Sequence, residues 1–165
     1  MNRKEVFMFK GIPSNLSDFS NLPESALENP FQAAALTVIA LCHYCVKPET
    51  GIEMLNYLKG PQPLSTYEQQ FLRDRLTDKK YLPYSYFEGA SPENNYTPSV
   101  PFKITVMEDP YSYSEEGYAK LLIKSSGADQ ARPIKLRCKG AEKWFLWEQF
   151  LLSDIKQPTE ADPWA

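Results

Sequence analysis

Two thiols and the chain's only imidazole lie within four residues of one another, at Cys42, His43 and Cys45. Thiolates and imidazoles are metal ligands, and a histidine beside a nucleophile can act as its general base. Neighbouring residues on a helix point about 100° apart, so Cys42 and His43 do not easily share a metal, and Cys42 with Cys45 supplies only two ligands. We therefore expect a packed helix with a hydrogen-bonded histidine, and we predict no catalytic residue, no metal site and no cofactor.

Tyrosines and prolines concentrate in the middle of the chain. Seven of the ten tyrosines and five prolines fall between Tyr81 and Tyr118. A tyrosine ring has an apolar body and one polar end, which suits recognition surfaces, and proline lowers the entropy lost on binding. The alternative is that the rings only cover the sheet edge or the open end of a helical layer. The candidate binding residues in this region are Tyr84, Tyr86, Tyr96, Tyr111 and Tyr113.

A turn-like segment at 125–132 carries hydroxyls, a glycine, Asp129 and Arg132. These groups could form a small anion site or an acid–base pair. The segment lacks the rest of a phosphate loop, because no lysine follows a glycine-rich run into a helix. Turn chemistry explains the same residues, with Asp129 bonded to its own backbone and Arg132 free to pair with Asp129. Asp129 and Arg132 are candidate binding residues on the first hypothesis.

Basic residues alternate along two neighbouring predicted strands, and the expected register places them on one sheet face. Such a face favours an anion or an acidic partner. Alternatively, its charges are solvated and discourage edge-to-edge aggregation. A nucleic acid is disfavoured by the formal net charge of −3. The residues are Lys120, Lys124, Lys135, Arg137 and Lys139.

The segment 143–152 is rich in aromatic residues, with Trp144, Phe145 and Trp147 close together. As a strand it is apolar on both faces, so both faces must be covered. The helical layer covers one of them. The aromatic loop, the C-terminal arm or a second subunit covers the other, and the last alternative predicts a homodimer with Trp147 as a candidate binding residue.

The composition is that of one folded domain. The 165 residues are 42% hydrophobic and 24% charged, which excludes a disordered chain, and 14 prolines without a period exclude a collagen-like repeat. The apolar stretch 31–46 is too short for a transmembrane span, and residues 1–10 lack the apolar core of a signal peptide. With three cysteines, an odd count, these features predict a cytoplasmic protein that binds neither membrane nor nucleic acid.

Helix signals crowd the first half of the chain. Asn29-Pro30 is an N-cap with a first-turn proline, a second helix starts near Pro48 and stops at Gly60, and S-x-x-E at 65–68 is a capping box. A shorter helix fits at about 22–28. Beyond these, alternating residues predict strands near 102–106, 118–124, 134–139 and 143–152, with turns at 125–129 and 139–142.

We therefore predict an α+β fold, with three to four N-terminal helices packed on one face of a three- to four-stranded antiparallel sheet. The expected organisation is a single domain over 1–165. Its parts are a helical region at about 20–80, a Tyr/Pro-rich loop at 81–101, a sheet region at 102–155 and an extended C-terminal arm at 156–165.

The C-terminal third resembles a bacterial family known only as a domain of unknown function. The resemblance rests on S-S-G-A-D-x-x-R-P-I at 125–134, W-F-L-W-E at 144–148 and D-P-W-A at 162–165. It implies a compact intracellular protein or module and brings no catalytic residues with it. The order of helices before strands is also similar to the nuclear-transport-factor-2-like fold, although no motif supports that likeness.

Two functions stay open. The first is a non-catalytic module that binds another protein or a second copy of itself, and a filled core with a flat exposed aromatic patch would favour it. The second is a small-molecule-binding or hydrolytic domain with a pocket between sheet and helices, and with Arg132 or Asp129 at its rim. A deep polar-lined cavity beside those two residues would favour the second function.

Overall fold

In the part of the chain that the structure describes, the sheet has five strands that follow one another in chain order. The computed structural model describes residues 2–140 and 142–164. In it the strands are β1 (Lys4–Phe9), β2 (Phe102–Met107), β3 (Tyr118–Ile123), β4 (Arg132–Lys139) and β5 (Lys143–Gln149). Every neighbouring pair is antiparallel, so β1 and β5 are the two edges. Ala141, in the turn predicted between β4 and β5, lies outside the described residues.

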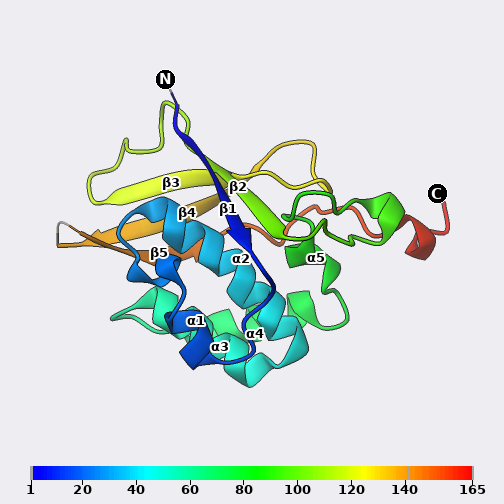
Figure 1. Cartoon of the computed structure of the whole chain (residues 1–165), viewed down its shortest axis with the longest axis horizontal. Coiled ribbons are helices and arrows are strands. Elements are labelled where there is room, and N and C mark those ends of the chain that lie inside the picture. The colour runs from blue at the N-terminus through cyan, green and yellow to red at the C-terminus, as the bar shows by residue number, and fades with distance from the viewer. Residues whose placement is uncertain (1, 141, 165) are drawn as a thin grey trace.

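The helices gather on one side of the sheet (Figure 1). They are α1 (Leu16–Ser20), α2 (Pro30–Val46), α3 (Pro48–Lys59), α4 (Thr66–Leu76) and α5 (Tyr81–Tyr84), with 3₁₀ turns at Pro23–Ala26, Pro92–Asn94 and Thr159–Ala161. The mixed α and β fold with an antiparallel sheet is confirmed. The predicted counts of three to four strands and three to four helices are both too low.

The boundaries of the long helices follow from the predicted caps. The Asn29 side chain accepts a hydrogen bond from the Gln32 N–H at 3.0 Å where α2 begins. At the start of α4, the Ser65 hydroxyl accepts from the Glu68 N–H at 3.0 Å while the Glu68 carboxylate accepts from the Ser65 N–H at 2.9 Å. α3 ends before Gly60, whose positive φ of 67° stops the helix.

The core is built around α2, which is buried on almost all sides because it lies between the sheet and α3 (Figure 1). The sheet contributes fully buried residues to the same cluster, among them Ile104, Leu121 and Leu136. This arrangement explains why α2 shows no polar face in the sequence. No helix among the described residues is long and apolar enough to cross a bilayer.

The sequence prediction missed β1. Its residues pair with β2 from Lys4 opposite Met107 to Phe9 opposite Phe102. The strand does alternate, since Phe9 is buried whereas Val6 and Met8 are exposed. The alternation is invisible in the sequence because the residues from Val6 to Phe9 are all apolar, on both faces.

The Tyr/Pro-rich loop 81–101 packs into the body of the protein. The Tyr86 hydroxyl donates to the Leu151 carbonyl, and the Tyr96 hydroxyl donates to the Lys156 carbonyl at 2.5 Å. The loop and the C-terminal arm therefore lie side by side (Figure 1). Trp164 is exposed and does not anchor the arm, and Ala165 lies outside the described residues.

Candidate functional site

The structure places three of the five candidate tyrosines in the core or at its border. Tyr86 and Tyr96 are each 2% exposed, and Tyr84 is half-buried against Phe87 and Phe102. Burial raises the pKa of Tyr84 and of Tyr96 to about 12, because an apolar environment disfavours the phenolate. The Tyr86 ring is thus packed in the core, whereas Tyr84 and Tyr96 line a hollow of about 600 Å³. The role of these three rings in binding stays a prediction.

Tyr111 and Tyr113 are exposed in the turn between β2 and β3. Asp109 shapes this turn, since its carboxylate accepts a hydrogen bond from the Tyr111 N–H at 2.8 Å. Partial burial and a hydrogen bond with Glu108 raise the pKa of Tyr113 to about 12. Both rings are accessible to a partner, and their role in binding stays a prediction.

Arg132 links β4 to the segment after β5. Its Nε donates to the Ser153 carbonyl and its Nη2 to the Asp154 carbonyl, both at 2.9 Å. Among the described residues it makes no ion pair with Asp129, although both line a shallow hollow of about 320 Å³. The geometry gives Arg132 a structural task and leaves its ligand-binding role untested.

The Cys42 thiol and the imidazole of α2 are packed inside the protein, whereas Cys45 is partly exposed. Cys42 is fully buried and His43 is nearly so, with no hydrogen-bond partner for the His43 Nε2 among the described residues. Burial raises the pKa of the Cys42 thiol well above its usual value and lowers the pKa of His43. No group of three His, Cys, Asp or Glu side chains within 2–140 and 142–164 could hold a metal ion.

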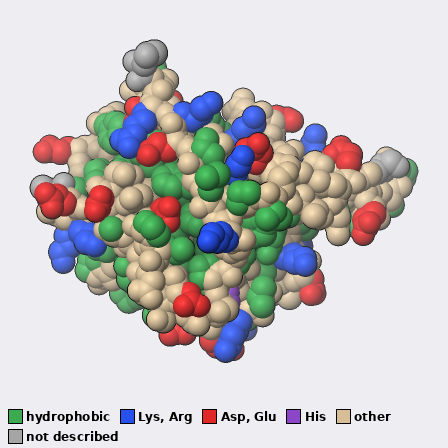
Figure 2. Space-filling model, in the orientation of Figure 1, with side chains coloured by type: hydrophobic (Ala, Val, Ile, Leu, Met, Phe, Trp, Pro, Cys, Tyr) green, Lys and Arg blue, Asp and Glu red, His purple; other side chains and the backbone are tan. Residues whose placement is uncertain are grey.

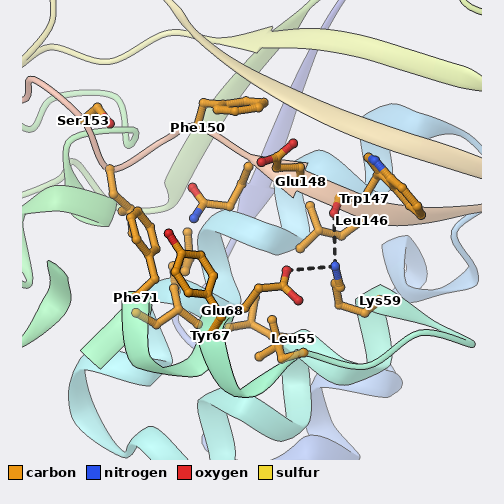
Figure 3. Close-up of a pocket in the computed structure, with 15 residues that line it drawn as sticks. Leu55, Lys59, Tyr67, Glu68, Phe71, Leu146, Trp147, Glu148, Phe150 and Ser153 are labelled. Atoms are coloured by element: carbon orange, nitrogen blue, oxygen red, sulfur yellow. Dashed lines mark hydrogen bonds and ion pairs between the residues drawn. The ribbon is translucent and has the colours of Figure 1, made fainter. Parts of the chain in front are cut away.

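Lys59 of α3 and Glu68 of α4 form an ion pair that faces β5 and that the sequence analysis missed (Figure 3). The Lys59 Nζ donates to the Glu68 Oε2 and to the Trp147 carbonyl oxygen, each at 3.1 Å. The Lys59 side chain is 7% exposed, against 38% for Glu68. Burial acts to raise the pKa of Glu68, but hydrogen bonds from Ser65 and Lys59 outweigh it, so the pKa is lowered. The Glu68 carboxyl is therefore ionised at neutral pH, and its ion pair with Lys59 fastens β5 to the helices.

Two hollows flank this ion pair along β5. The α4–β5 hollow, of about 270 Å³, has Tyr67 and Phe71 of α4 on one side and Phe150 on the other (Figure 3). The β4–β5 hollow, of about 340 Å³, is lined by Pro61, Gln62, Phe145, Leu146 and the basic residues Lys59, Arg137 and Lys139. Trp147 borders both hollows, so this predicted binding residue does lie at a cavity.

The predicted basic sheet face is present on β3 and β4. Lys120 lies directly opposite Lys135 in the register. The Lys135 ammonium forms an ion pair with Glu115 at 2.7 Å and lies 4.5 Å from the centre of the Tyr118 ring. The repulsion between the two lysines is thus partly offset by a carboxylate and an aromatic face.

The two edge strands of the sheet differ in whether their outward backbone N–H and C=O groups form hydrogen bonds. At β5, the Trp144 N–H donates to the Leu27 carbonyl at 3.0 Å, and Lys59 donates to the Trp147 carbonyl. At β1, the Glu108 N–H donates to the Arg3 carbonyl, so residues 3, 5, 7 and 9 bond to β2. The N–H and C=O groups of residues 4, 6 and 8 consequently point away from β2. No other described segment bonds to them.

The open edge also exposes apolar side chains. Val6 is 52% exposed and Met8 is 61% exposed. Figure 2 shows hydrophobic side chains at the surface along the path that β1 follows in Figure 1, interspersed with charged ones. An unpaired strand edge with exposed apolar residues is a template for another strand.

Within the described residues, the fold is a five-stranded antiparallel meander backed by helices on one side. It defines an α+β protein whose β5 edge is partly bonded and whose β1 edge is open. The chain belongs to the family described as "Domain of unknown function (DUF6935)", whose model matches residues 11–159. The resemblance to an uncharacterised family is therefore confirmed. No curated protein and no solved structure matches the chain, and the likeness to the nuclear-transport-factor-2-like fold stays a prediction.

Proposed function

We propose that this protein is a non-catalytic, self-associating module in which β1 of one copy pairs with β1 of a second copy. The observation that carries the proposal is the contrast between the two sheet edges. At β5 the Trp144 N–H and the Trp147 carbonyl bond to other groups of the protein, whereas β1 presents unpaired backbone beside the exposed Val6 and Met8. The open edge supports addition of a strand.

A second copy is the partner that fits because β1 is complementary to itself. Antiparallel pairing of identical strands creates a two-fold axis. With Val6 opposite Val6 of the partner subunit, Lys4 lies opposite Met8 of the partner subunit. Residues 4, 6 and 8 of each copy, whose backbone groups point outward, then all exchange hydrogen bonds. If this register shifted by a single residue, the outward-pointing N–H and C=O groups of one copy would face groups of the other copy that are already bonded within its own sheet.

The resulting interface is small. Edge pairing of two short strands buries on the order of 1,000 Å² or less, which is the range of weak and transient complexes. We therefore expect a reversible dimer in the micromolar range or weaker. The free thiols Cys42, Cys45 and Cys138 support a reducing compartment, and we place the module in the cytoplasm.

Sedimentation velocity over a concentration series tests the proposal. The wild type should shift from monomer to dimer, and Val6→Lys should stay monomeric because two ammonium groups would meet at the two-fold axis. Val46→Lys is the matched control, since Val46 is also an exposed valine but lies at the end of α2. A wild type that is monomeric at every concentration, or a dimer that survives Val6→Lys, would contradict the proposal.

Val6→Pro provides a second variant that spares the fold. The Val6 N–H points away from β2, so its loss breaks no hydrogen bond of the β1–β2 ladder. The dimer should be lost while the melting temperature changes little. Phe7→Pro removes a donor to β2 and should instead lower the melting temperature.

A further inference from the structure

We propose that the β4–β5 hollow binds an organic anion, in which a carboxylate, sulfonate or phosphate group is attached to an aromatic or apolar body. The hollow lies beside β5, at the opposite end of the sheet from β1. This inference is independent of self-association.

The charge of the hollow favours an anion. Three basic side chains line it, those of Lys59, Arg137 and Lys139, and no carboxylate does. Glu68 neutralises Lys59 from the far side. Arg137 and Lys139 form no ion pair among the described residues, so their charges are available to a ligand. An anion placed here would reduce the repulsion between neighbouring basic groups.

Arg137 is positioned to recognise the anionic group. Its guanidinium carbon lies 4.8 Å from the centre of the Trp147 ring and 5.4 Å from that of Tyr118. The two rings are themselves in T-shaped contact at 5.6 Å. Aromatic contact restrains a guanidinium without using its N–H donors, and those of Arg137 are not engaged with any described residue. A planar fork of free donors matches a carboxylate, sulfonate or phosphate.

The walls of the hollow require more than an inorganic ion. Pro61, Phe145 and Leu146 contribute apolar surface to a volume of about 340 Å³, which is the size of a small-ligand site. The Phe145 ring is held in place by close packing on Gly60, where a Cβ would lie 2.5 Å from the ring. A ligand with an aromatic or apolar body can cover this surface while its anionic group meets Arg137.

The test uses two fluorescent probes that differ in charge. 1-Anilinonaphthalene-8-sulfonate is an aromatic anion, and N-phenyl-1-naphthylamine is the same ring system without the sulfonate. We expect the sulfonate probe to bind the wild-type protein more tightly than the neutral probe. Arg137→Gln should weaken the sulfonate probe by about tenfold or more, the usual effect of losing a charge-assisted hydrogen bond. The neutral probe should be unaffected by that substitution.

Lys120→Gln is the matched control, because it removes one positive charge from β3 without touching the hollow. It should leave the affinity for the sulfonate probe nearly unchanged. Equal weakening by both substitutions would mean that overall charge attracts the probe, and it would overturn the proposal. So would equal affinity for the two probes, or no binding of the sulfonate probe.

Protection of Cys138 locates the site in the unmodified protein. Cys138 lines the same hollow and is partly exposed. The sulfonate probe at saturation should slow alkylation of Cys138 by iodoacetamide while leaving the rate at Cys45 unchanged, as followed by mass spectrometry. Unprotected Cys138 in the presence of bound probe would place the probe elsewhere and would contradict the proposal.

Discussion

A Cβ on Gly51 of α3 would overlap the Cα of Tyr44 on α2. The two helices therefore approach each other at a point where no side chain fits on α3. Helix propensity alone predicts that Gly51→Ala stabilises the protein, by about 1 kcal/mol. The packing predicts the opposite, a loss of about 1–3 kcal/mol of unfolding free energy. Urea unfolding decides between the two, and a stabilised Gly51→Ala variant would contradict the close contact.

Removal of the Tyr86 ring should destabilise the protein strongly. The ring is buried, and its hydroxyl donates to the Leu151 carbonyl. We expect Tyr86→Ala to lower the unfolding free energy by about 3–5 kcal/mol and Tyr86→Phe by about 1–2 kcal/mol. Tyr111→Ala, in an exposed turn, is the control and should have almost no effect. A Tyr86→Ala variant as stable as the wild type would show that the ring does not belong to the core.

The Lys59–Glu68 pair should respond unequally to the loss of each partner. Glu68→Gln leaves the Lys59 ammonium buried without a counter-charge, and we expect the unfolding free energy to fall by about 2 kcal/mol. Lys59→Met fills the same space and leaves Glu68 in contact with water, so its cost should be below about 1 kcal/mol. Chemical unfolding of both variants shows which substitution lowers the unfolding free energy more. Equal losses, or the reverse order, would mean that Lys59 is not sequestered.

His43 should make stability depend on pH in a defined window. Burial lowers its pKa below the ordinary value of 6.5, so the unfolded chain binds a proton more readily than the folded one. Stability is therefore complete above that value and falls as the pH drops below it. His43 is the only histidine and ordinary carboxyl groups titrate lower, so the window between about pH 7 and pH 5 reports mainly on this residue.

The measurement is the melting temperature of the wild type and of His43→Asn across that window. The wild type should lose stability toward pH 5 and the variant should lose clearly less. Parallel curves for the two proteins would contradict the assignment of the acid sensitivity to His43.

Much of the helical layer was predictable because its signals are local. The Asn29 cap and the Ser65–Glu68 capping box act within a single turn, and the structure has both helices start there. β1 could not be found in the same way. Its partner is β2, which follows it only after the whole helical region, and its run of apolar residues hides the alternation.

The candidate site was less predictable because it also depends on contacts between residues that are far apart in the sequence. The density of tyrosines is visible in the sequence, but the burial of Tyr86 and Tyr96 depends on Leu151 and Lys156, far along the chain. Nothing in the sequence marks Lys59 as a site residue, because its bond to the Trp147 carbonyl joins residues that are 88 positions apart. The basic residues of β4 were visible because they alternate within one strand.

The central claim, that β1 pairs with β1 about Val6, is tested most directly by a disulfide. Cα atoms of hydrogen-bonded antiparallel partners lie about 5.5 Å apart, within the range that a disulfide spans. In a background of Cys45→Ser and Cys138→Ser, mild oxidation of Val6→Cys should yield a covalent dimer. Met8→Cys, which faces Lys4 of the partner subunit, should stay monomeric. A monomeric Val6→Cys protein, or equal cross-linking of both variants, would contradict the account.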